Sequence, residues 1–534
     1  MSCNPANGLR QQVAELILVR ASGYLNDRQR RYPLWELSNA ELQRCLCQGV
    51  GGVILLGGGA VELQQRTLML RRWSNRRLLI CADVEEGVGQ RFEGASWLVP
   101  PLALGRLYQN HPKQALLLAE RYGHCIGSQA HRCGLNWVLG PVCDINNNPA
   151  NPVINVRAWG EDSASVSALV TAFQRGLSTT GVLSCAKHFP GHGDTTSDSH
   201  LGLPVLPHTR DRLKEVELLP FREAIAAGVD SVMTAHLLLP ELDSDHPASL
   251  SKAILTDLLR VDLDFDGLIV TDALVMEAVA MRYGAAEAAV LAFEAGADLI
   301  LMPADTDAAI TGLCDAFRSG RFSQARLQAS LQRRHRALER VMKPLQTMPP
   351  ITSDAEQALE QELITTCLHI TPNAGIDIAR GINLVRVDSV SPCSPFYGIA
   401  PALRLPELQG FQSLVIHGQG VSPWQSQDDS PLALNRLGEG PVLLQLFLRG
   451  NPFRGQQDSR EPWSAAVRQL QRLNRLAGLV IYGSPYIWDE LKTALKPGIP
   501  AAYSPGQMPE AQQQVLIALF NNAKTTTAYA NFTS

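Results

Sequence analysis

The sequence lacks the cysteine spacing that marks metal-binding knuckles and small disulfide-stapled domains. Its eleven cysteines are scattered along 534 residues without a CxxC pair, a pattern typical of reduced, buried thiols. Long hydrophobic runs are absent too: the longest near the N-terminus, AELILV, is far too short to span a bilayer. Because no basic segment precedes an apolar core there, we expect no signal peptide, no membrane partner and a cytoplasmic protein.

An excess of charge of one sign is also missing. The 47 lysines and arginines nearly balance the 51 aspartates and glutamates, which leaves a net charge of −4. Without a basic stripe we expect no nucleic-acid partner. The chain is 45% hydrophobic and too long for one ordinary domain, so it predicts at least two hydrophobic cores.

Short apolar runs alternate with helix-like segments through the first part of the chain. There are eight of them: LILVRASG from 16, GVILLGG from 52, LLICADVE from 78, NWVLGPVCDI from 136, VLSCAKHF from 182, SVMTAHLL from 231, GLIVTDAL from 267 and ADLILMPA from 297. This alternation predicts an α/β fold with a parallel sheet, and eight units suit a TIM-type (β/α)8 barrel. The alternative is an open doubly wound sheet, but GGVILLGGGA does not present GxGxxG between a strand and a helix.

The alternation begins again after a proline-bearing stretch. INLVRV, SLVIHGQG, PVLLQLFLRG and GLVIYGSP predict a second, smaller α/β sandwich domain. We therefore predict a catalytic barrel over residues 1–345, a linker over 346–354, the second domain over 355–522 and a polar tail over 523–534. The second domain carries no catalytic signature, so we expect it to serve packing or subunit contacts; the sequence leaves the oligomeric state open.

Titratable side chains recur where five of the predicted strands end. They are Asp83 with Glu85, Asp144, Lys187 with His188, His236, and Asp272. A lone loop aspartate is more commonly a helix cap or an ion-pair partner. In a (β/α)8 barrel, however, the carboxyl ends of the strands converge on one mouth, where active sites are built. The five strand ends together predict a site at that mouth.

The stretch AKHFPGHGDTTSDSHLGLP, residues 186–204, predicts a polar loop over the mouth. Asp198 stands two residues from His200, where a carboxylate can fix the imidazole tautomer and prepare it as a general acid or base. Asp272, flanked by apolar residues, is a candidate nucleophile. His192 and Asp194 are expected to shape the loop.

The density of histidines in this stretch also raises a metal site as an alternative. His188, His192 and His200 could be metal ligands. Neither an HExxH helix nor a Cys/His knuckle accompanies them, so we predict no metal and no cofactor.

The segment KHFPGHGDTTSDSH resembles the signature of glycoside hydrolase family 3, in its β-N-acetylhexosaminidase branch. Three further segments are similar to that family's pattern and occur in the same order: DVEEGVGQR from 83, DINNNPANPVINVRAWGED from 144 and MTAHLLLPELDSDHPASLS from 233. The resemblance covers about residues 10–345. It departs at Glu85-Glu86-Gly87, where the family usually has Glu-Gly-Gly, and this predicts an extra carboxylate near the site.

The resemblance implies a retaining, exo-acting β-N-acetylhexosaminidase. Asp272 would be the nucleophile, and His200, supported by Asp198, the acid/base. Substrate-binding roles are implied for six residues: Asp83, Arg91, Arg157, Lys187, His188 and His236. The implied partner is a small-molecule glycoside that carries terminal β-linked N-acetylglucosamine, and the resemblance implies muropeptides of peptidoglycan recycling as its source.

Four alternatives stay open at this point. A neutral imidazole acid does not repel phosphate, so a β-N-acetylglucosaminide phosphorylase is one of them, and catalysis assisted by the substrate's own acetamido group is another. A β-glucosidase of the same family is disfavoured, because such enzymes usually take the acid/base from the C-terminal domain and lack the Asp-Ser-His loop. A silent sugar-binding protein would have lost Asp272, Asp198 or His200, and all three are present.

Overall fold

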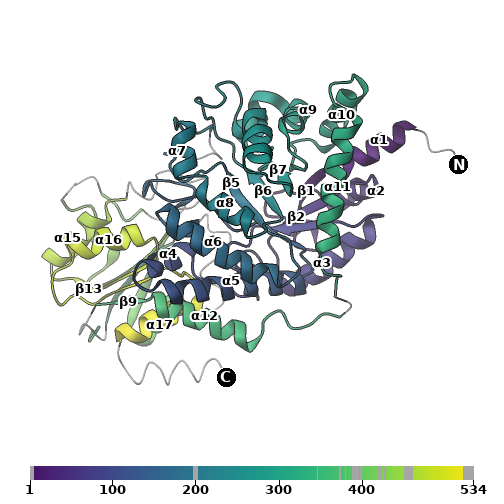
Figure 1. The fold of residues 1–534 in the computed structure, drawn as a ribbon. Coiled ribbons are helices and arrows are strands. Elements are labelled where there is room, and N and C mark those ends of the chain that lie inside the picture. The colour runs from purple at the N-terminus through teal and green to yellow at the C-terminus, as the bar shows by residue number, and fades with distance from the viewer. Residues whose placement is uncertain are drawn as a thin grey trace. The chain divides into compact units, whose positions relative to one another are not determined.

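The computed structural model describes residues 5–196, 202–345, 347–371, 375–378, 380–387, 396, 400–417, 422–425, 429–449 and 461–520. The chain divides into two compact units. The first comprises Met1–Trp97 and Leu104–Gln357, and the second comprises Leu98–Ala103 and Ala358–Ser534. Figure 1 shows the elements of both.

The first unit is built on parallel strands that alternate with helices. The strands are β1 (Ile17–Ser22), β2 (Gly52–Leu56), β3 (Leu79–Ala82), β4 (Trp137–Val138), β5 (Cys185–Phe189), β6 (Ser231–Thr234), β7 (Leu268–Val270) and β8 (Ile300–Leu301). Each lies within one of the eight apolar runs, which confirms the predicted α/β fold class. Most of their side chains are buried, as expected when helices cover a parallel sheet.

The strands follow one another in chain order around a curled sheet. Hydrogen-bonded neighbours run β4-β3-β2-β1-β8 in one arc and β5-β6-β7 in the other. Isolated parallel bridges join the arcs: Trp137 pairs with Leu183 beside β5, and Val270 pairs with Leu299 beside β8. The carboxyl ends of all eight strands therefore face the same mouth, as in a (β/α)8 barrel.

Helices occupy the connections between the barrel strands. They are α2 (Asn39–Cys47), α3 (Ala60–Trp73), α4 (Pro101–Asn110), α5 (Pro112–Arg132), α6 (Ser163–Ser178), α7 (Arg210–Glu215), α8 (Leu219–Ala226), a π-helix (Ala253–Asp262), α9 (Glu277–Ala295), α10 (Thr306–Arg318) and α11 (Gln324–Arg340), with α1 (Pro5–Ala14) before β1. Helix α9 is interrupted at Gly284, whose φ of 70° is outside the helical region. Of the helices described, none is long and apolar enough to cross a membrane.

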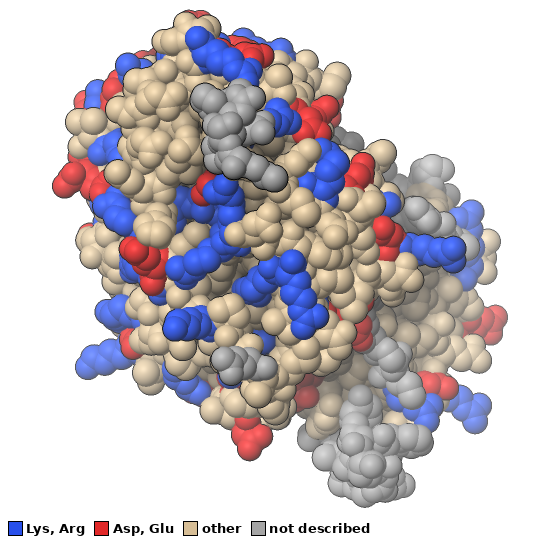
Figure 2. Space-filling view, turned by 90° about the vertical axis from the view of Figure 1, so that its right-hand side faces the viewer, with Lys and Arg blue, Asp and Glu red and all other residues tan. Residues whose placement is uncertain are grey.

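Basic side chains gather across the middle of the face that Figure 2 presents, with acidic ones among and around them. Helix α11, at the right in Figure 1, contributes arginines that are paired. Arg333 contacts Asp298 at 3.3 Å, and Arg340 contacts Asp230 at 2.7 Å. These two ion pairs join α11 to the segments that directly precede β8 and β6.

The second unit is a separate α/β domain with a mixed sheet in the order β11-β10-β12-β13-β14-β9. Its strands are β9 (His369–Ile370), β10 (Gly381–Arg386), β11 (Phe411–Ile416), β12 (Val442–Leu448), β13 (Leu476–Gly483) and β14 (Ala501–Ser504). Its helices are α13 (Pro401–Leu408), α14 (Leu434–Leu437), α15 (Trp463–Arg472), α16 (Pro485–Ala494) and α17 (Pro509–Phe520), and α12 (Asp354–Cys367) precedes β9. Strand β9 is antiparallel to β14. Both β12 and β13 are buried along their whole length, so each lies inside the domain.

Candidate active site at the barrel mouth

Strand β5 brings a lysine and a histidine into the mouth of the barrel. All five of its residues are buried, so the chain places Lys187 and His188 where neither can keep an ordinary hydration shell. A buried cation requires counter-charges. The loops that follow strands β3 and β4 supply them.

Lys187 and Arg157 share the carboxylate of Glu85. The Lys187 Nζ atom lies 2.6 Å from Glu85 Oε1 and 2.7 Å from Asp83 Oδ1. Arg157, at the end of a short 3-10 helix (Asn155–Arg157), donates through Nε and Nη2 to the two oxygens of Glu85, both at 2.8 Å. This planar, two-bond pairing is the strongest geometry available to an arginine. It fixes the position of both cations.

The pKa shifts of Glu85 and Lys187 favour the charged form of each. Burial alone would raise the pKa of Glu85, but Arg157 and Lys187 hold it well below its ordinary value. Burial would also lower the pKa of Lys187, and Asp83 and Glu85 raise it instead. The Asp83 side chain is still 34% exposed, whereas Lys187 is 1% exposed. Asp83 is therefore the member that can offer a carboxylate oxygen to a sugar hydroxyl.

His188 is oriented by the buried carboxylate of Asp144. Its Nδ1 lies 2.7 Å from Asp144 Oδ2, and because a carboxylate only accepts, Nδ1 carries the donated proton. The other ring nitrogen lies 3.5 Å from Arg157 Nη2. Burial would raise the pKa of Asp144, but His188 and His192 lower it. Asp144 thus holds the predicted substrate-binding imidazole and is itself fully buried.

The loops that follow β4 and β5 are tied together by Asn151. Its Nδ2 donates to the carbonyl oxygens of His192 and Gly193 at 2.9 and 2.8 Å. The Asn151 Oδ1 atom accepts from the main-chain N–H groups of Val153 and Ile154, both at 2.8 Å. His192 in turn donates its main-chain N–H to Asp144 at 2.7 Å. No role for Asn151 was predicted from the sequence, yet its side chain sets the path of the loop through His192 and Gly193.

Asp272 follows the end of β7, as predicted, and its side chain is partly exposed. Its Oδ1 accepts from the N–H of Ala273 at 2.7 Å. His236, after β6, is fully buried. Its ring contacts Ser249 Oγ at 2.7 Å through Nδ1 and the carbonyl oxygen of Ala273 at 3.1 Å through Nε2. This placement favours a role for His236 in positioning the loop that carries Asp272. It does not favour the predicted role of contacting the substrate.

Arg91 and Glu86 follow Asp83 in the loop after β3. The Nε of Arg91 donates to the main-chain oxygen of Asp83 at 2.8 Å. Glu86, which stands where the family usually has glycine, is fully buried. Its Oε2 accepts from the indole N–H of Trp97 at 3.2 Å. The extra carboxylate predicted near the site is thus engaged by Trp97.

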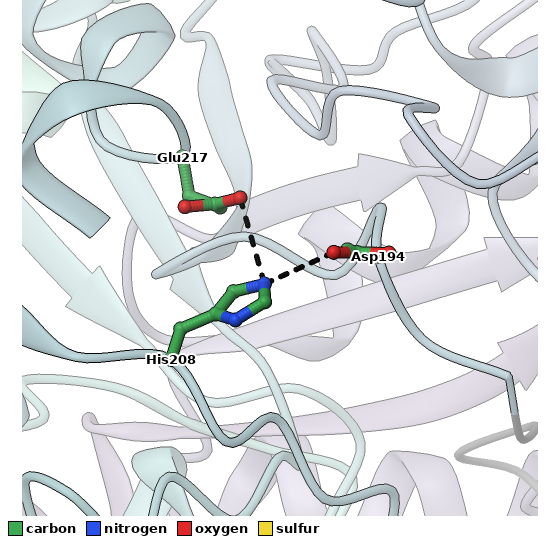
Figure 3. Close-up of side chains that lie close together, drawn as sticks. All are labelled: Asp194, His208 and Glu217. Atoms are coloured by element: carbon green, nitrogen blue, oxygen red, sulfur yellow. Dashed lines mark hydrogen bonds and ion pairs between the residues drawn. The ribbon is translucent and has the colours of Figure 1, made fainter. Parts of the chain in front are cut away.

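Asp198 and His200 lie outside the described residues. The chain on either side of them is joined by a hydrogen bond, shown in Figure 3: His208 Nε2 lies 3.1 Å from Asp194 Oδ2, and it also lies 3.8 Å from Glu217 Oε1. One atom from each of the three groups falls within 4.8 Å of the others, a spacing that could hold a metal ion. Arg212 also pairs with Glu217 at 3.1 Å, so Glu217 has a counter-charge within the protein.

Two residues of the mouth were missed as site residues in the sequence analysis. Glu85 was noted at the end of a strand but given no role, although it is the carboxylate that Lys187 and Arg157 share. Arg20 of β1, whose Cζ atom lies 5.1 Å from the centre of the Tyr32 ring and which pairs with the buried Glu36 at 3.9 Å, was passed over altogether. The signal for Arg20 was present, because it is the single charged residue in the run LILVRASG and a buried strand does not keep a charge without a partner or a use.

The strand ends of the barrel converge on this ionic network. This arrangement places the protein in the class of α/β-barrel enzymes that have the active site at the mouth. Comparison with known families is more specific. Residues 8–337 match the Glycosyl hydrolase family 3 N terminal domain, and residues 377–521 match the Bacterial Glycosyl hydrolase family 3 C-terminal domain. The chain belongs to glycosyl hydrolase family 3, which confirms both the predicted family and the predicted class of glycoside hydrolase.

Individual relatives agree with this assignment. The chain is 38% identical over 284 residues to a Beta-hexosaminidase of Chromobacterium violaceum, a match that covers 52% of this chain and 79% of that protein. It is 33% identical over 342 residues to Beta-hexosaminidase A of Pseudoalteromonas piscicida, which covers 58% of this chain; the chain spans 57% of the length of that relative. A solved family 3 β-N-acetylglucosaminidase from Paenibacillus sp. str. FPU-7 superposes with a TM-score of 0.78 at 27% identity, covering 96% of both chains.

Proposed function

We propose that the protein is a retaining, exo-acting β-N-acetylhexosaminidase that removes terminal β-linked N-acetylglucosamine. The observation that supports this most is the buried Lys187–Glu85–Arg157 network, with the partly exposed Asp83 beside it and Asp272 just after β7. Charged groups held this rigidly can orient the hydroxyls of a sugar in front of a nucleophile. Relatives named β-hexosaminidase support the acetamido sugar as substrate.

In the proposed mechanism, the carboxylate of Asp272 attacks the anomeric carbon and forms a covalent glycosyl-enzyme. His200, oriented by Asp198, donates a proton to the leaving oxygen as the glycosidic bond breaks. It then removes a proton from the water that attacks the glycosyl-enzyme, so the anomeric configuration is retained. Asp83, Lys187, Arg157 and His188 hold the sugar in this scheme. Muropeptides as substrate and a cytoplasmic location stay predictions.

The nucleophile can be identified directly. A 5-fluoro analogue of a β-N-acetylglucosaminyl donor slows breakdown of the intermediate, and mass spectrometry of the digested protein then locates the added sugar. We expect the label on the peptide that contains Asp272, and no label in Asp272→Ala. A fully active Asp272→Ala variant would instead indicate catalysis assisted by the acetamido group.

The competing activities are separated by initial rates on 4-nitrophenyl β-N-acetylglucosaminide and 4-nitrophenyl β-glucoside, each with and without phosphate. We expect the acetamido sugar to be hydrolysed at a rate indifferent to phosphate, and the activity to be lost in His200→Ala. Release of sugar 1-phosphate would indicate a phosphorylase, and preference for the glucoside a β-glucosidase. A chain that turns over neither sugar would be a sugar-binding protein.

A further inference from the structure

One histidine and two carboxylates from three segments of the chain meet beside the loop that follows β5. Asp194 belongs to that loop, His208 shortly precedes α7, and Glu217 stands between α7 and α8. Figure 3 shows the imidazole of His208 pointing toward both carboxylates. One possible ligand atom from each residue lies within 4.8 Å of the other two. This set differs from the three histidines that the sequence raised as alternative metal ligands.

The spacing of these atoms fits a zinc ion. Zinc binds an imidazole nitrogen at about 2.0–2.1 Å and a carboxylate oxygen at about 2.0–2.2 Å, usually with tetrahedral geometry. Two ligand atoms of such a tetrahedron are therefore about 3.3 Å apart. In the protein, His208 Nε2 lies 3.1 Å from Asp194 Oδ2 and 3.8 Å from Glu217 Oε1. Small side-chain rotations are enough to direct all three atoms at one ion.

The charges around the cluster also favour a cation. Arg212 pairs with the buried Glu217 through hydrogen bonds of 3.1, 3.3 and 3.4 Å. These bonds are longer than the two 2.8 Å bonds that join Arg157 to Glu85, and the Arg212 side chain is 42% exposed. Two carboxylates, one guanidinium and a neutral imidazole leave a net charge of −1. A divalent cation is therefore attracted to the cluster.

The possible ligands are held in place and are still open to solvent. Gly191 lies so close to Glu217 that a Cβ atom on the glycine would meet the Cβ of Glu217 at 2.9 Å. This contact fixes Glu217 against the loop that carries Asp194. The side chains of Asp194 and His208 are 32% and 18% exposed. An ion can therefore enter from solvent, and a water molecule can take its fourth position.

We infer that Asp194, His208 and Glu217 form a zinc site that joins the loop after β5 to the chain around α7. An imidazole nitrogen suits zinc, whereas magnesium and calcium prefer oxygen ligands. His208 binds the ion through Nε2 and keeps its proton on Nδ1, because a metal takes the neutral imidazole. In the sequence, Asp194 precedes Asp198 and His200, and His208 follows them. The ion thus fastens the chain on both sides of the predicted acid/base pair.

The test is thermal unfolding of the whole chain with and without zinc chloride, after removal of metals with a chelator, at about pH 7.5, where an ordinary imidazole is mostly neutral. An ion that binds only the folded protein raises Tm. At a zinc concentration of about 100 times Kd, we expect a rise of about 2–4 °C. Isothermal titration calorimetry should give one tightly bound zinc per chain. Magnesium chloride and calcium chloride at the same concentration should leave Tm unchanged.

The main variant is His208→Gln, in which the amide can still form hydrogen bonds but the imidazole nitrogen is lost. We expect it to lose the rise in Tm that zinc produces. Because the rise is measured within each protein, a lower starting Tm of the variant does not affect the comparison. The matched control is His335→Gln. His335 lies 3.1 Å from the carboxylate of Glu339 but belongs to no three-ligand cluster among the described residues, so this variant should keep the whole rise.

Three results would overturn the inference. The first is a wild-type Tm that does not rise with zinc. The second is a rise that His208→Gln keeps, and loss of that rise in His200→Ala would then assign the ion to Asp198 and His200. The third is an equal rise with magnesium or calcium, which would show a site made by the carboxylates without the imidazole. Each of these results leaves the proposed function standing, because no turnover of a glycoside is measured.

Discussion

His192 is held neutral in the folded protein, since burial lowers the pKa of its imidazole to about 4. In the unfolded chain a histidine titrates near pH 6.5. Between these two values the unfolded chain binds a proton that the folded chain does not take, so acid favours unfolding. The difference corresponds to about 3 kcal/mol of stability that is present above pH 6.5 and lost by pH 4.

We therefore expect His192→Gln, which cannot titrate, to lose less stability than the wild type between pH 6.5 and pH 4. The measurement is urea unfolding at both pH values. His335→Gln is the control, because His335 is 72% exposed on a helix surface, and it should follow the wild type. Equal losses in His192→Gln and the wild type would show that His192 already carries a proton in the fold.

Most residues of the candidate site could be predicted from the sequence, because a titratable residue directly after an apolar strand run is expected at the mouth of a (β/α)8 barrel. Asp83, Lys187, His188 and Asp272 were placed at the mouth in this way. The ion-pair partners of these residues could not be predicted. Which carboxylate faces which cation depends on the directions of side chains that belong to separate loops. The sharing of Glu85 by Lys187 and Arg157 is an example.

At the scale of the elements, the loop that follows β5 is closely packed against its neighbour at Gly193. A Cβ atom at this position would overlap the carbonyl oxygen of Ile145 in the loop after β4. At Gly202, beyond Asp198 and His200, a Cβ would meet nothing within 4 Å. The loop is therefore fixed at its start by close contact with its neighbour.

These two glycines form a matched pair for substitution. We expect Gly193→Ala to destabilise the protein by about 1–3 kcal/mol, the usual cost of overpacking, and to lower kcat at least tenfold because the path to His200 is displaced. Gly202→Ala should stay within about twofold of the wild type, as ordinary surface substitutions do. Thermal unfolding and steady-state rates on 4-nitrophenyl β-N-acetylglucosaminide give both quantities. Equal kcat values for the two variants would argue against a fixed loop.

The strands were predictable because their apolar runs are short, bounded by turns and regularly spaced. Strands β9 and β14 were not predicted. Strand β9 has two exposed residues, so it carries no apolar signal, and its antiparallel pairing depends on β14 alone. The π-helix and the break at Gly284 were missed for a similar reason, since both depend on local backbone geometry that leaves the apolar periodicity unchanged.

At the scale of the whole molecule, every described residue of the candidate site belongs to the first unit. That unit extends past the predicted barrel end at 345 into α12, where Glu356 pairs with Arg132. The Glu356 Oε2 atom also accepts from Gln129 at 3.3 Å. The start of α12 thus completes the hydrogen bonding of α5.

We expect a fragment ending at Cys367, the last residue of α12, to fold and to hydrolyse 4-nitrophenyl β-N-acetylglucosaminide. A fragment ending at residue 345 should melt at a lower temperature, because Arg132 loses its partner and breaking a partly buried pair is costly. Thermal unfolding and activity of the two fragments are the measurements. Loss of activity in the longer fragment despite a cooperative transition would assign part of the site to residues after 367.

The buried network at the mouth has a consequence for ionic strength. Its four members, Asp83, Glu85, Lys187 and Arg157, carry two charges of each sign and sum to zero. An uncharged sugar therefore binds without displacing counterions. Added salt then has little charge–charge attraction between the sugar and the network to screen. Sodium chloride should therefore leave the KM of a neutral glycoside nearly constant.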